Sequence, residues 1–448
     1  MTPSPDNIAA IATAPGRGGI GVVRVSGRDL MDIASALTGR KLTPRLATYT
    51  DFLAQNGDIL DQGIALFFVA PHSYTGEEVL ELQGHGGPAV LQTILQRCLE
   101  LGARLAQPGE FTQRAFLNDK IDLLQAEGVA DLIDATSQQA ARSAVRSLQG
   151  DFSSAINSVV SGLINLRILV EATLDFPEEE GVDTLEQNGL FAKLATIQTE
   201  LGRIVELSKQ GQILREGAQI VLVGAPNVGK SSLLNRLAGE EIALVSEIPG
   251  TTRDAIRQEL QIKGVPLHII DTAGLRETND VVELMGIART QQNIERADLV
   301  LLLSDASTFK PFWDEANVIA RLSPSIPRLF VHNKIDLSGR FDQEVVQGST
   351  NHLYVSAKTG DGIDSLREKI LEMIGWHNES GVFMARARHL SSLSQASKHL
   401  SAAALQLGAL ELMAEELRLA QLTLNQITGE FVADDLLGEI FSRFCIGK

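Results

Sequence analysis

One short stretch limits the folds open to this 448-residue chain more than any other feature: residues 224–231 read Gly-Ala-Pro-Asn-Val-Gly-Lys-Ser. The stretch directly follows an apolar run at 220–223, which has the length of a buried strand. Glycines let backbone N–H groups curl around a phosphate, and a helix that starts there adds the positive end of its dipole. We therefore expect a phosphate-binding loop between a strand and a helix, with Lys230 on the β- and γ-phosphates and Ser231 on Mg²⁺.

Three further motifs follow this loop in the order typical of a guanine-nucleotide-binding domain. Asp271-Thr-Ala-Gly274 ends a strand and places a carboxylate beside the metal and a backbone N–H near the γ-phosphate. Asn333-Lys-Ile-Asp336 ends another strand, and its last carboxylate accepts from guanine N1–H and the 2-amino group, a donor pair that adenine lacks. Ser356-Ala-Lys358 supplies a backbone N–H for guanine O6. The predicted GTP-binding residues are Asn227, Val228, Gly229, Lys230, Ser231, Ser232, Asp271, Thr272, Ala273, Gly274, Asn333, Lys334, Asp336, Ser356, Ala357 and Lys358.

The residues that would catalyse hydrolysis are less clear than those that would bind GTP. In Ras-like proteins a Gln directly after the Asp-x-x-Gly motif orients the attacking water, and here that position is Leu275, which cannot do so. Arg253, Arg257 and Arg276 lie nearby in the chain, but the sequence alone marks none of them as an arginine finger. We take Arg276 and Asp254 as catalytic candidates because both lie close to the nucleotide motifs.

The chain outside this Ras-like α/β P-loop GTPase domain has two different patterns. Residues 1–118 alternate short β-like stretches with Gly and Pro, and are predicted to form an α+β domain in which Cys98 fills the core. Residues 119–215 and 376–448 are rich in Ala and Leu and are predicted to be helical. We expect one all-α domain interrupted by the GTPase domain at 216–375, because compact domains tolerate such insertions; two separate helical pieces are the alternative.

Composition narrows the class of protein. The 39 basic and 56 acidic residues give a net charge of −17, so RNA binding would need a local basic patch or another subunit. The N-terminus has no basic segment of a secretion signal, and the longest apolar run, 299–303, has the length of a buried strand. We therefore expect a cytoplasmic protein outside the membrane, with an organellar protein after processing as the alternative. His85 lies between glycines without partner ligands, which favours a tight turn over a metal site.

The four motifs, the switch-distance segment 247–254 and the C-terminal tail Phe441-Ser-Arg-Phe-Cys-Ile-Gly-Lys448 together resemble the MnmE (TrmE) family of tRNA-modification GTPases over essentially the full length. The resemblance implies that K⁺ takes the place of an arginine finger and that its site forms when two GTPase domains pair. The residues that it places on ions or water are Asn227, Ser246, Ile248 and Thr251 on K⁺, Ser231 and Thr252 on Mg²⁺, and Glu283 as the residue that orients the water indirectly. Without the resemblance, Glu283 reads as part of a solvated helix face.

The same resemblance gives the first domain the folate-binding fold shared with aminomethyltransferases, and also makes it the dimerisation domain. Arg24, Glu81, Lys120 and Lys448 match the positions that contact a tetrahydrofolate one-carbon derivative, and Cys445 has a candidate redox or catalytic role. The tail also resembles a prenylation box, but the terminal Lys is a poor fit to one. The resemblance further implies a homodimer that acts on tRNA with MnmG, a partner that uses FAD and NADH. The two would install an aminomethyl or carboxymethylaminomethyl group at C5 of the wobble uridine.

Two other functions remain open from the residues themselves. A ribosome-assembly GTPase of the Era or EngA type shares the P-loop, but it would carry a KH-like RNA-binding domain after the GTPase domain. Residues 386–448 contain no helical Gly-x-x-Gly signature of such a domain. A helical scaffold with a regulatory nucleotide switch is the second alternative, and folate binding by the first domain would exclude it.

Overall fold

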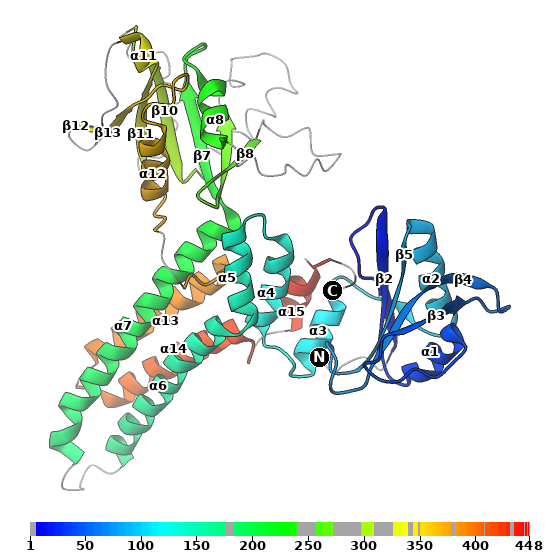
Figure 1. The fold of residues 1–448 in the computed structure, drawn as a ribbon. Coiled ribbons are helices and arrows are strands. Elements are labelled where there is room, and N and C mark those ends of the chain that lie inside the picture. Colours follow the sequence, from blue (N-terminus) through cyan, green and yellow to red (C-terminus); the bar gives the residue numbers. More distant parts are fainter. Residues whose placement is uncertain are drawn as a thin grey trace, which may run out of the picture. The chain divides into compact units, whose positions relative to one another are not determined.

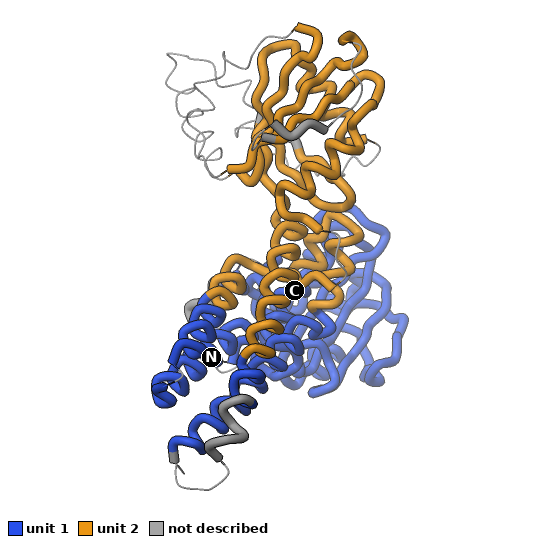
Figure 2. The backbone as a smooth tube through the Cα atoms, turned by 90° about the vertical axis from the view of Figure 1, so that its left-hand side faces the viewer, with its two compact units in different colours: residues 1–130, 148–194, 395–448 blue, residues 131–147, 195–394 orange. Residues whose placement is uncertain are grey.

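A computed structural model describes the chain at residues 6–175, 182–239, 257–271, 297–308, 326–338, 344–347, 350–377, 381–406, 408–430, 434–442, 444–445 and 447. The chain divides into two compact units, which Figure 2 shows in different colours. The first unit contains residues 1–130, 148–194 and 395–448, and the second contains residues 131–147 and 195–394. The bounds of the four segments expected from the sequence, 1–118, 119–215, 216–375 and 376–448, stay predictions.

A six-stranded sheet with two helices forms the beginning of the first unit (Figure 1). The strand order is β3-β4-β5-β2-β1-β6, and all neighbours are antiparallel except β1 and β6. The two helices share one apolar core with the strands, in which Cys98 is fully buried as predicted, and burial raises the pKa of its thiol to about 12. The elements are β1 (Ile8–Ile11), β2 (Gly18–Gly27), α1 (Leu30–Thr38), β3 (Thr48–Leu53), β4 (Ile59–Phe68), β5 (Glu78–Gly86), α2 (Pro88–Glu100) and β6 (Arg104–Leu105).

The prediction that His85 lies in a tight turn is wrong. His85 lies in strand β5, not in a tight turn, and its exposed ring pairs through Nδ1 with the Asp61 carboxylate at 2.7 Å. The same carboxylate accepts the backbone N–H of His85 at 2.7 Å, which fixes the ring on its strand. Among the described residues no group of three or more His, Cys, Asp or Glu side chains could hold a metal ion.

The rest of the first unit is helical. Helices α6 and α14 lie side by side, and Arg167 of α6 donates to Gln421 of α14 at 2.9 Å, although the two are far apart in the sequence. Asp151–Leu174 of α6 is long and apolar enough to cross a membrane, and core helices of proteins outside membranes can have the same composition. The helices before and after the GTPase-domain segment, some of which continue into the second unit, are α3 (Glu110–Leu117), α4 (Leu123–Asp134), α5 (Gln138–Leu148), α6 (Asp151–Asp175), α7 (Val182–Glu216), α13 (Ala387–Leu405), α14 (Leu410–Thr428) and α15 (Asp434–Ser442).

A seven-stranded sheet is the main feature of the second unit. Its order is β12-β13-β11-β10-β7-β9-β8, with five parallel strands between two antiparallel edge strands. Alternate residues of the central strands belong to two different apolar clusters, so both faces of the sheet are buried, and the run at 299–303 is fully buried as predicted. The elements are β7 (Ala218–Gly224), α8 (Lys230–Ala238), β8 (Arg257–Ile262), β9 (Val265–Asp271), β10 (Leu299–Asp305), β11 (Arg328–Asn333), α11 (Ile335–Ser338), β12 (Glu344–Gln347), β13 (Thr350–Tyr354) and α12 (Ile363–Met373).

These elements confirm the predicted fold class: an α+β region, a helical region and an inserted α/β region in one chain. The parallel arrangement places the carboxyl ends of β7, β9, β10 and β11 at the same edge of the second sheet. The predicted nucleotide motifs follow these strands, so the fold brings them to one edge.

Candidate functional site

The loop between β7 and α8 has the conformation that a phosphate-binding loop needs. Strand β7 ends at Gly224 and helix α8 begins at Lys230, with Gly229 at its N-cap in a left-handed conformation at φ 96°. A side chain at Gly229 would collide with the amide nitrogen of Asn333, so the position requires glycine for space as well as for φ. The ammonium group of Lys230 donates to the Gly224 carbonyl at 2.6 Å, which holds it across the mouth of the loop.

The predicted base-recognition residues lie directly against this loop. The Asn333 side chain is almost fully buried; its Nδ2 donates to the Val228 carbonyl at 2.8 Å and its Oδ1 accepts the Ala357 N–H at 3.0 Å. Lys334 Nζ donates to the Asn227 carbonyl at 2.7 Å. One amide side chain therefore joins three motifs, the first of which lies more than a hundred residues before the other two in the chain.

The carboxylate predicted to read guanine is also held in place. Asp336 Oδ1 accepts from the Ser356 hydroxyl at 2.8 Å, which links the third motif to the fourth. Ser231 and Ser232 lie in the first turn of α8, and Asp271 is the last residue of β9, paired in register with Leu222 of β7. Lys358 is exposed at the rim, where its carbonyl accepts from Arg236 at 3.0 Å.

Asp305 is a site residue that the sequence reasoning missed. It ends strand β10, and its Oδ2 lies 2.7 Å from Lys334 Nζ. Burial alone would raise the pKa of this carboxyl, but the bonds from Lys334 and Ser307 outweigh burial and hold it below its ordinary value. The available signal was an acidic residue directly after a fully apolar strand, at the edge where the other motifs end.

Several predicted site residues lie outside the described residues, and their roles stay predictions. They include the three catalytic candidates, most of the predicted ion ligands and the last three residues of the Asp271–Gly274 motif. These residues are Ser246, Ile248, Thr251, Thr252, Asp254, Thr272, Ala273, Gly274, Arg276, Glu283 and Lys448.

A second candidate site lies on the six-stranded sheet of the first unit. Arg24 and Glu81 are opposite each other in the β2–β5 register, and the guanidinium donates to the carboxylate at 2.8 Å and 3.0 Å. Glu81 and Lys120 both line a pocket of about 430 Å³, and Lys120 Nζ donates to the Pro71 carbonyl at 3.0 Å. Three of the four predicted folate-contacting residues are therefore gathered at one place.

The pocket also has aromatic walls that the sequence reasoning did not identify. Tyr74 lines the pocket, and the Arg24 guanidinium lies 5.6 Å from the centre of its ring and 5.8 Å from that of Phe111. Burial raises the pKa of Tyr74, whose hydroxyl is 2.9 Å from that of Thr112. A flat ring system with hydrogen-bonding edges fits such a combination of stacking faces, carboxylate and cations.

The C-terminal tail packs against the helix that carries Phe111 and Thr112. The Gly109 N–H, at the start of α3, donates to the Cys445 carbonyl at 3.3 Å. Phe444 packs so closely on Gly109 that a side chain there would collide with it, and Gly447 packs equally closely against the Ile11 carbonyl. The Cys445 side chain is exposed and is a free thiol. The tail thus packs at the start of the helix whose Thr112 hydroxyl lies 2.9 Å from that of Tyr74 in the pocket wall.

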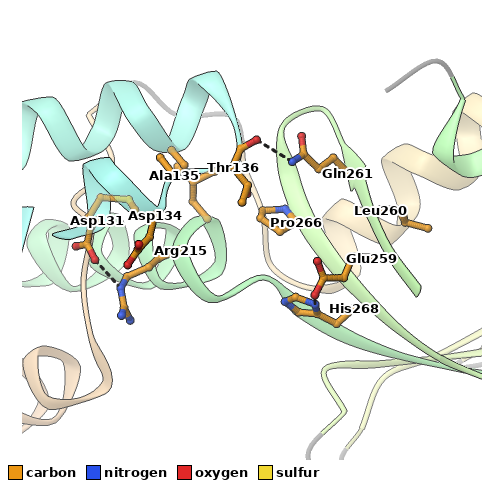
Figure 3. A pocket seen from close by; sticks show the side chains of 13 residues that line it. Asp131, Asp134, Ala135, Thr136, Arg215, Glu259, Leu260, Gln261, Pro266 and His268 are labelled. Carbon is orange, nitrogen blue, oxygen red and sulfur yellow. Dashed lines mark hydrogen bonds and ion pairs between the residues drawn. The ribbon is translucent and has the colours of Figure 1, made fainter. Parts of the chain in front are cut away.

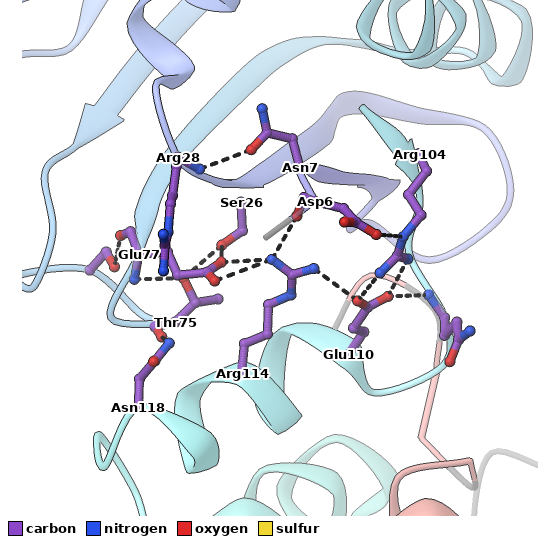
Figure 4. A network of polar contacts seen from close by, with 12 residues as sticks. Asp6, Asn7, Ser26, Arg28, Thr75, Glu77, Arg104, Glu110, Arg114 and Asn118 are labelled. Atoms are coloured by element: carbon purple, nitrogen blue, oxygen red, sulfur yellow. Dashed lines mark hydrogen bonds and ion pairs between the residues drawn. The ribbon is translucent and has the colours of Figure 1, made fainter. Parts of the chain in front are cut away.

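A buried network of charges fixes that helix (Figure 4). Arg114 of α3, 2% exposed, donates to Glu77 at 2.9 Å and to Glu110 at 3.0 Å, and Arg104 donates to Glu110 at 2.6 Å. Burial alone would raise the pKa of Glu110, but the hydrogen bonds, with that from Arg104 the strongest, hold the pKa below its ordinary value. The network ties α3 to the loop before β5 and to β6.

Replacing Arg114 by Met should lower the free energy of unfolding of this region by about 3–5 kcal/mol at pH 7, because the buried Glu110 and the half-buried Glu77 lose a cationic donor. The wild-type chain should also lose stability as the pH falls below about 4, since a lowered folded-state pKa stabilises only the ionised form, and the variant should show a smaller loss. Calorimetry across pH and hydrogen exchange of 110–117 measure both effects. As a control, Arg418→Met breaks an exposed pair and should leave the transition unchanged; an equal response of the two variants would contradict the prediction.

Comparison with known proteins gives matches over the whole chain. Residues 123–445 match a family model described as the MnmE helical domain, and residues 7–120 match one described as the GTP-binding protein TrmE N-terminus. The tRNA modification GTPase MnmE of Laribacter hongkongensis is 58% identical over 448 residues, which cover 99% of each chain. That of Thiobacillus denitrificans is 58% identical over 449 residues, covering 100% of this chain and 99% of the relative.

Two of the similar solved structures match part of the chain. Era from Aquifex aeolicus is 26% identical, with a TM-score of 0.27, and the match covers 41% of this chain and 66% of that one. The G domain of the T. maritima FeoB iron transporter is 26% identical, with a TM-score of 0.26, and the match covers 35% of this chain and 98% of that one.

Proposed function

The chain belongs to the MnmE family of tRNA modification GTPases, and from that premise we propose that it binds and hydrolyses GTP in order to modify tRNA. The observation that supports GTP binding most directly is the pair of hydrogen bonds of the Asn333 side chain, which donates to the Val228 carbonyl and accepts from the Ala357 N–H. This contact holds the phosphate loop against the base-recognition loop, which supports the binding of one guanine nucleotide across both loops. Asp336, positioned by Ser356, then selects guanine.

The chemistry of the donor set supports Mg²⁺ at the phosphate end of the site. The Ser231 hydroxyl at the start of α8 and Asp271 at the end of β9 are hard oxygen donors, which Mg²⁺ prefers, and Thr252 would complete the set. Bound there, Mg²⁺ would neutralise charge on the β- and γ-phosphates. Lys230, held across the loop, adds a fixed positive charge on the same phosphates.

We propose that K⁺ supplies the positive charge that an arginine finger supplies in other GTPases. Leu275 cannot orient water, and Asn227 presents an exposed amide beside the loop. Asn227 with the backbone of Ser246, Ile248 and Thr251 would hold the ion when two GTPase domains pair. Glu283 would then orient the water indirectly, with Arg276 and Asp254 as further catalytic candidates.

We propose that the first domain supplies the one-carbon unit for tRNA modification. The pocket at Glu81 and Lys120, with the Arg24 guanidinium between two rings, suits a tetrahydrofolate derivative, and Lys448 would reach its carboxylates. The proposed reaction is addition of an aminomethyl or carboxymethylaminomethyl group at C5 of the wobble uridine, in a cytoplasmic complex of the homodimer with MnmG. That partner would bring FAD and NADH, and Cys445 is a candidate redox or catalytic residue.

Nucleoside analysis of tRNA from cells that lack this protein tests the proposal. The C5-modified wobble uridine should disappear from the affected tRNAs and should return when the wild-type chain is expressed. Lys230→Ala should fail to restore it, because that variant loses the fixed charge on the phosphates. A normal modification profile in the deletion strain would contradict the proposed function and favour a ribosome-assembly GTPase.

A further inference from the structure

The hairpin of β8 and β9 is the only stretch of chain between the two segments that contain the predicted switch residues. Residues 240–256, with Thr251 and Thr252, precede β8, and residues 272–296, with Gly274, follow β9. The two strands are paired from Arg257↔Ile270 to Ile262↔Val265, and β9 is also paired with β7. The hairpin is therefore one stiff unit that joins both segments to the sheet.

The turn of this hairpin is fastened to the connection between α4 and α5 (Figure 3). Gln261 Nε2 donates to the Thr136 carbonyl at 3.1 Å. Gly264, in the turn, has φ +78°, and a side chain there would come within 3.2 Å of Gln139 Oε1 at the start of α5. The turn thus fits closely against residues 136–139 without a Cβ to hold it away.

A second fastening holds the middle of β9 to the end of α7. The ring nitrogen Nε2 of His268 is 3.0 Å from the Glu216 carbonyl, which can only accept, so this nitrogen donates. Gly217 follows Glu216 with φ +71°, and a side chain there would lie 2.9 Å from the Pro266 carbonyl. Because Gly217 directly precedes β7, this contact holds β9 close to the start of the strand that leads to the phosphate loop.

Between the two fastenings the packing is incomplete. A cavity of about 290 Å³ lies under the hairpin, with Asp131, Thr136 and Arg215 on the helical side and Glu259, Gln261 and His268 on the hairpin side (Figure 3). The lining of the cavity is mixed, with Ala135 and Leu260 beside the polar groups, so the apolar packing between the hairpin and the α4–α5 connection is interrupted there. The hydrogen bond from Gln261 adds a polar link across this gap, and the cavity leaves room for the hairpin to shift.

Helix α5 shares an apolar core with the sheet next to this cavity. Ala140 and Ala144 of α5 are buried in the same apolar cluster as Leu260, Ile262 and Leu267 of the hairpin. Any shift of the hairpin that keeps the Gln261 bond must therefore be followed by the start of α5. If the bond is lost, the shared apolar cluster is the remaining link at this place, and the turn of the hairpin can shift relative to Thr136.

We propose that Gln261 is a positioning residue that ties the β8–β9 hairpin to the α4–α5 connection, so that the state of the bound guanine nucleotide is passed to α5. This inference rests on the proposed GTPase function. In GTPases the γ-phosphate with its Mg²⁺ orders the two switch segments, and hydrolysis releases them. Here the ordering of both segments acts on the two ends of one hairpin, whose turn is held by Gln261.

Hydrogen exchange of residues 135–148 in the full-length purified chain tests the inference, with Mg²⁺ and either GDP or a non-hydrolysable GTP analogue. In the wild-type chain the exchange of this segment should differ between the two nucleotides. Gln261→Ala should reduce that difference by about five-fold, the value expected for one net hydrogen bond, while the affinity for both nucleotides stays the same. Gln139→Ala, which loosens the fit beside Gly264, should reduce it in the same direction.

Glu368→Gln is the matched control, because it breaks the 3.0 Å ion pair of Lys263 in the same turn but touches neither fastening. It should leave the nucleotide-dependent difference intact. An undiminished difference in both Gln261→Ala and Gln139→Ala, or no difference in a wild-type chain that binds both nucleotides, overturns the inference and leaves the proposed function in place. A wild-type chain that binds neither nucleotide overturns the proposed function and the inference together.

Discussion

Replacing Asp336 by Asn is expected to weaken GTP binding by about 10²- to 10³-fold, as for the loss of a charged partner in a buried pair. The carboxylate can accept from guanine N1–H and from the 2-amino group at once, whereas the amide presents a donor to one of these two donors. Xanthine carries a carbonyl in place of the 2-amino group, so the amide of the variant can pair with both groups. Xanthosine triphosphate should therefore bind the variant more tightly than GTP does.

The structure indicates that this substitution should leave the fold of the loop unchanged. Ser356 Oγ donates to Asp336 Oδ1 at 2.8 Å, and an asparagine carbonyl at the same place can accept that bond, so the loop should keep its position. Fluorescent-nucleotide titration with both triphosphates measures the switch. Asp364→Asn is the control, because its side chain is 91% exposed at the start of α12 and should change neither affinity. Tight GTP binding by Asp336→Asn would show that this residue does not read the base.

The elements that the sequence predicts well are those specified by neighbouring residues. The phosphate loop requires glycine at Gly229 and an apolar strand before it, and both requirements are visible within the ten residues 220–229. The buried strands of the second sheet are continuous apolar runs, because parallel strands are covered on both faces. Their order along the chain then implies that the motifs meet at one edge of the sheet.

The features that the sequence does not predict depend on residues that are distant in the chain. The Asp305–Lys334 pair, the Arg114–Glu77 pair and the packing of Phe444 on Gly109 follow from the tertiary fold alone. An isolated charge or glycine looks the same in the sequence whether it is buried or on the surface. The error at His85 has a similar cause: flanking glycines suggest a turn, but the partner Asp61 on the neighbouring strand keeps the segment extended.

Hydrolysis of GTP is expected to be much faster in K⁺ than in Na⁺ at equal ionic strength. Leu275 cannot orient the attacking water, so another group must assist hydrolysis. A cation between the phosphates would supply positive charge where negative charge develops in the transition state. Because the proposed ion site is complete only when two GTPase domains meet, the rate per chain should also rise with protein concentration. Steady-state phosphate release in the two salts, at several protein concentrations, measures both effects.

Replacing Asn227 should remove the difference between the salts and slow hydrolysis by at most about 10³- to 10⁵-fold, the range that an arginine finger supplies. Asn227 has φ 66°, where alanine is strained and glycine is not, so Asn227→Gly removes the amide ligand while the backbone keeps its shape. The Asn227 carbonyl, which accepts from Lys334, is retained in every variant. Asn227→Asp keeps an oxygen ligand and should preserve part of the K⁺ stimulation. Equal stimulation by K⁺ in the wild-type chain and in Asn227→Gly would exclude this side chain as the ligand, and equal wild-type rates in K⁺ and Na⁺ would exclude a cation in place of the finger.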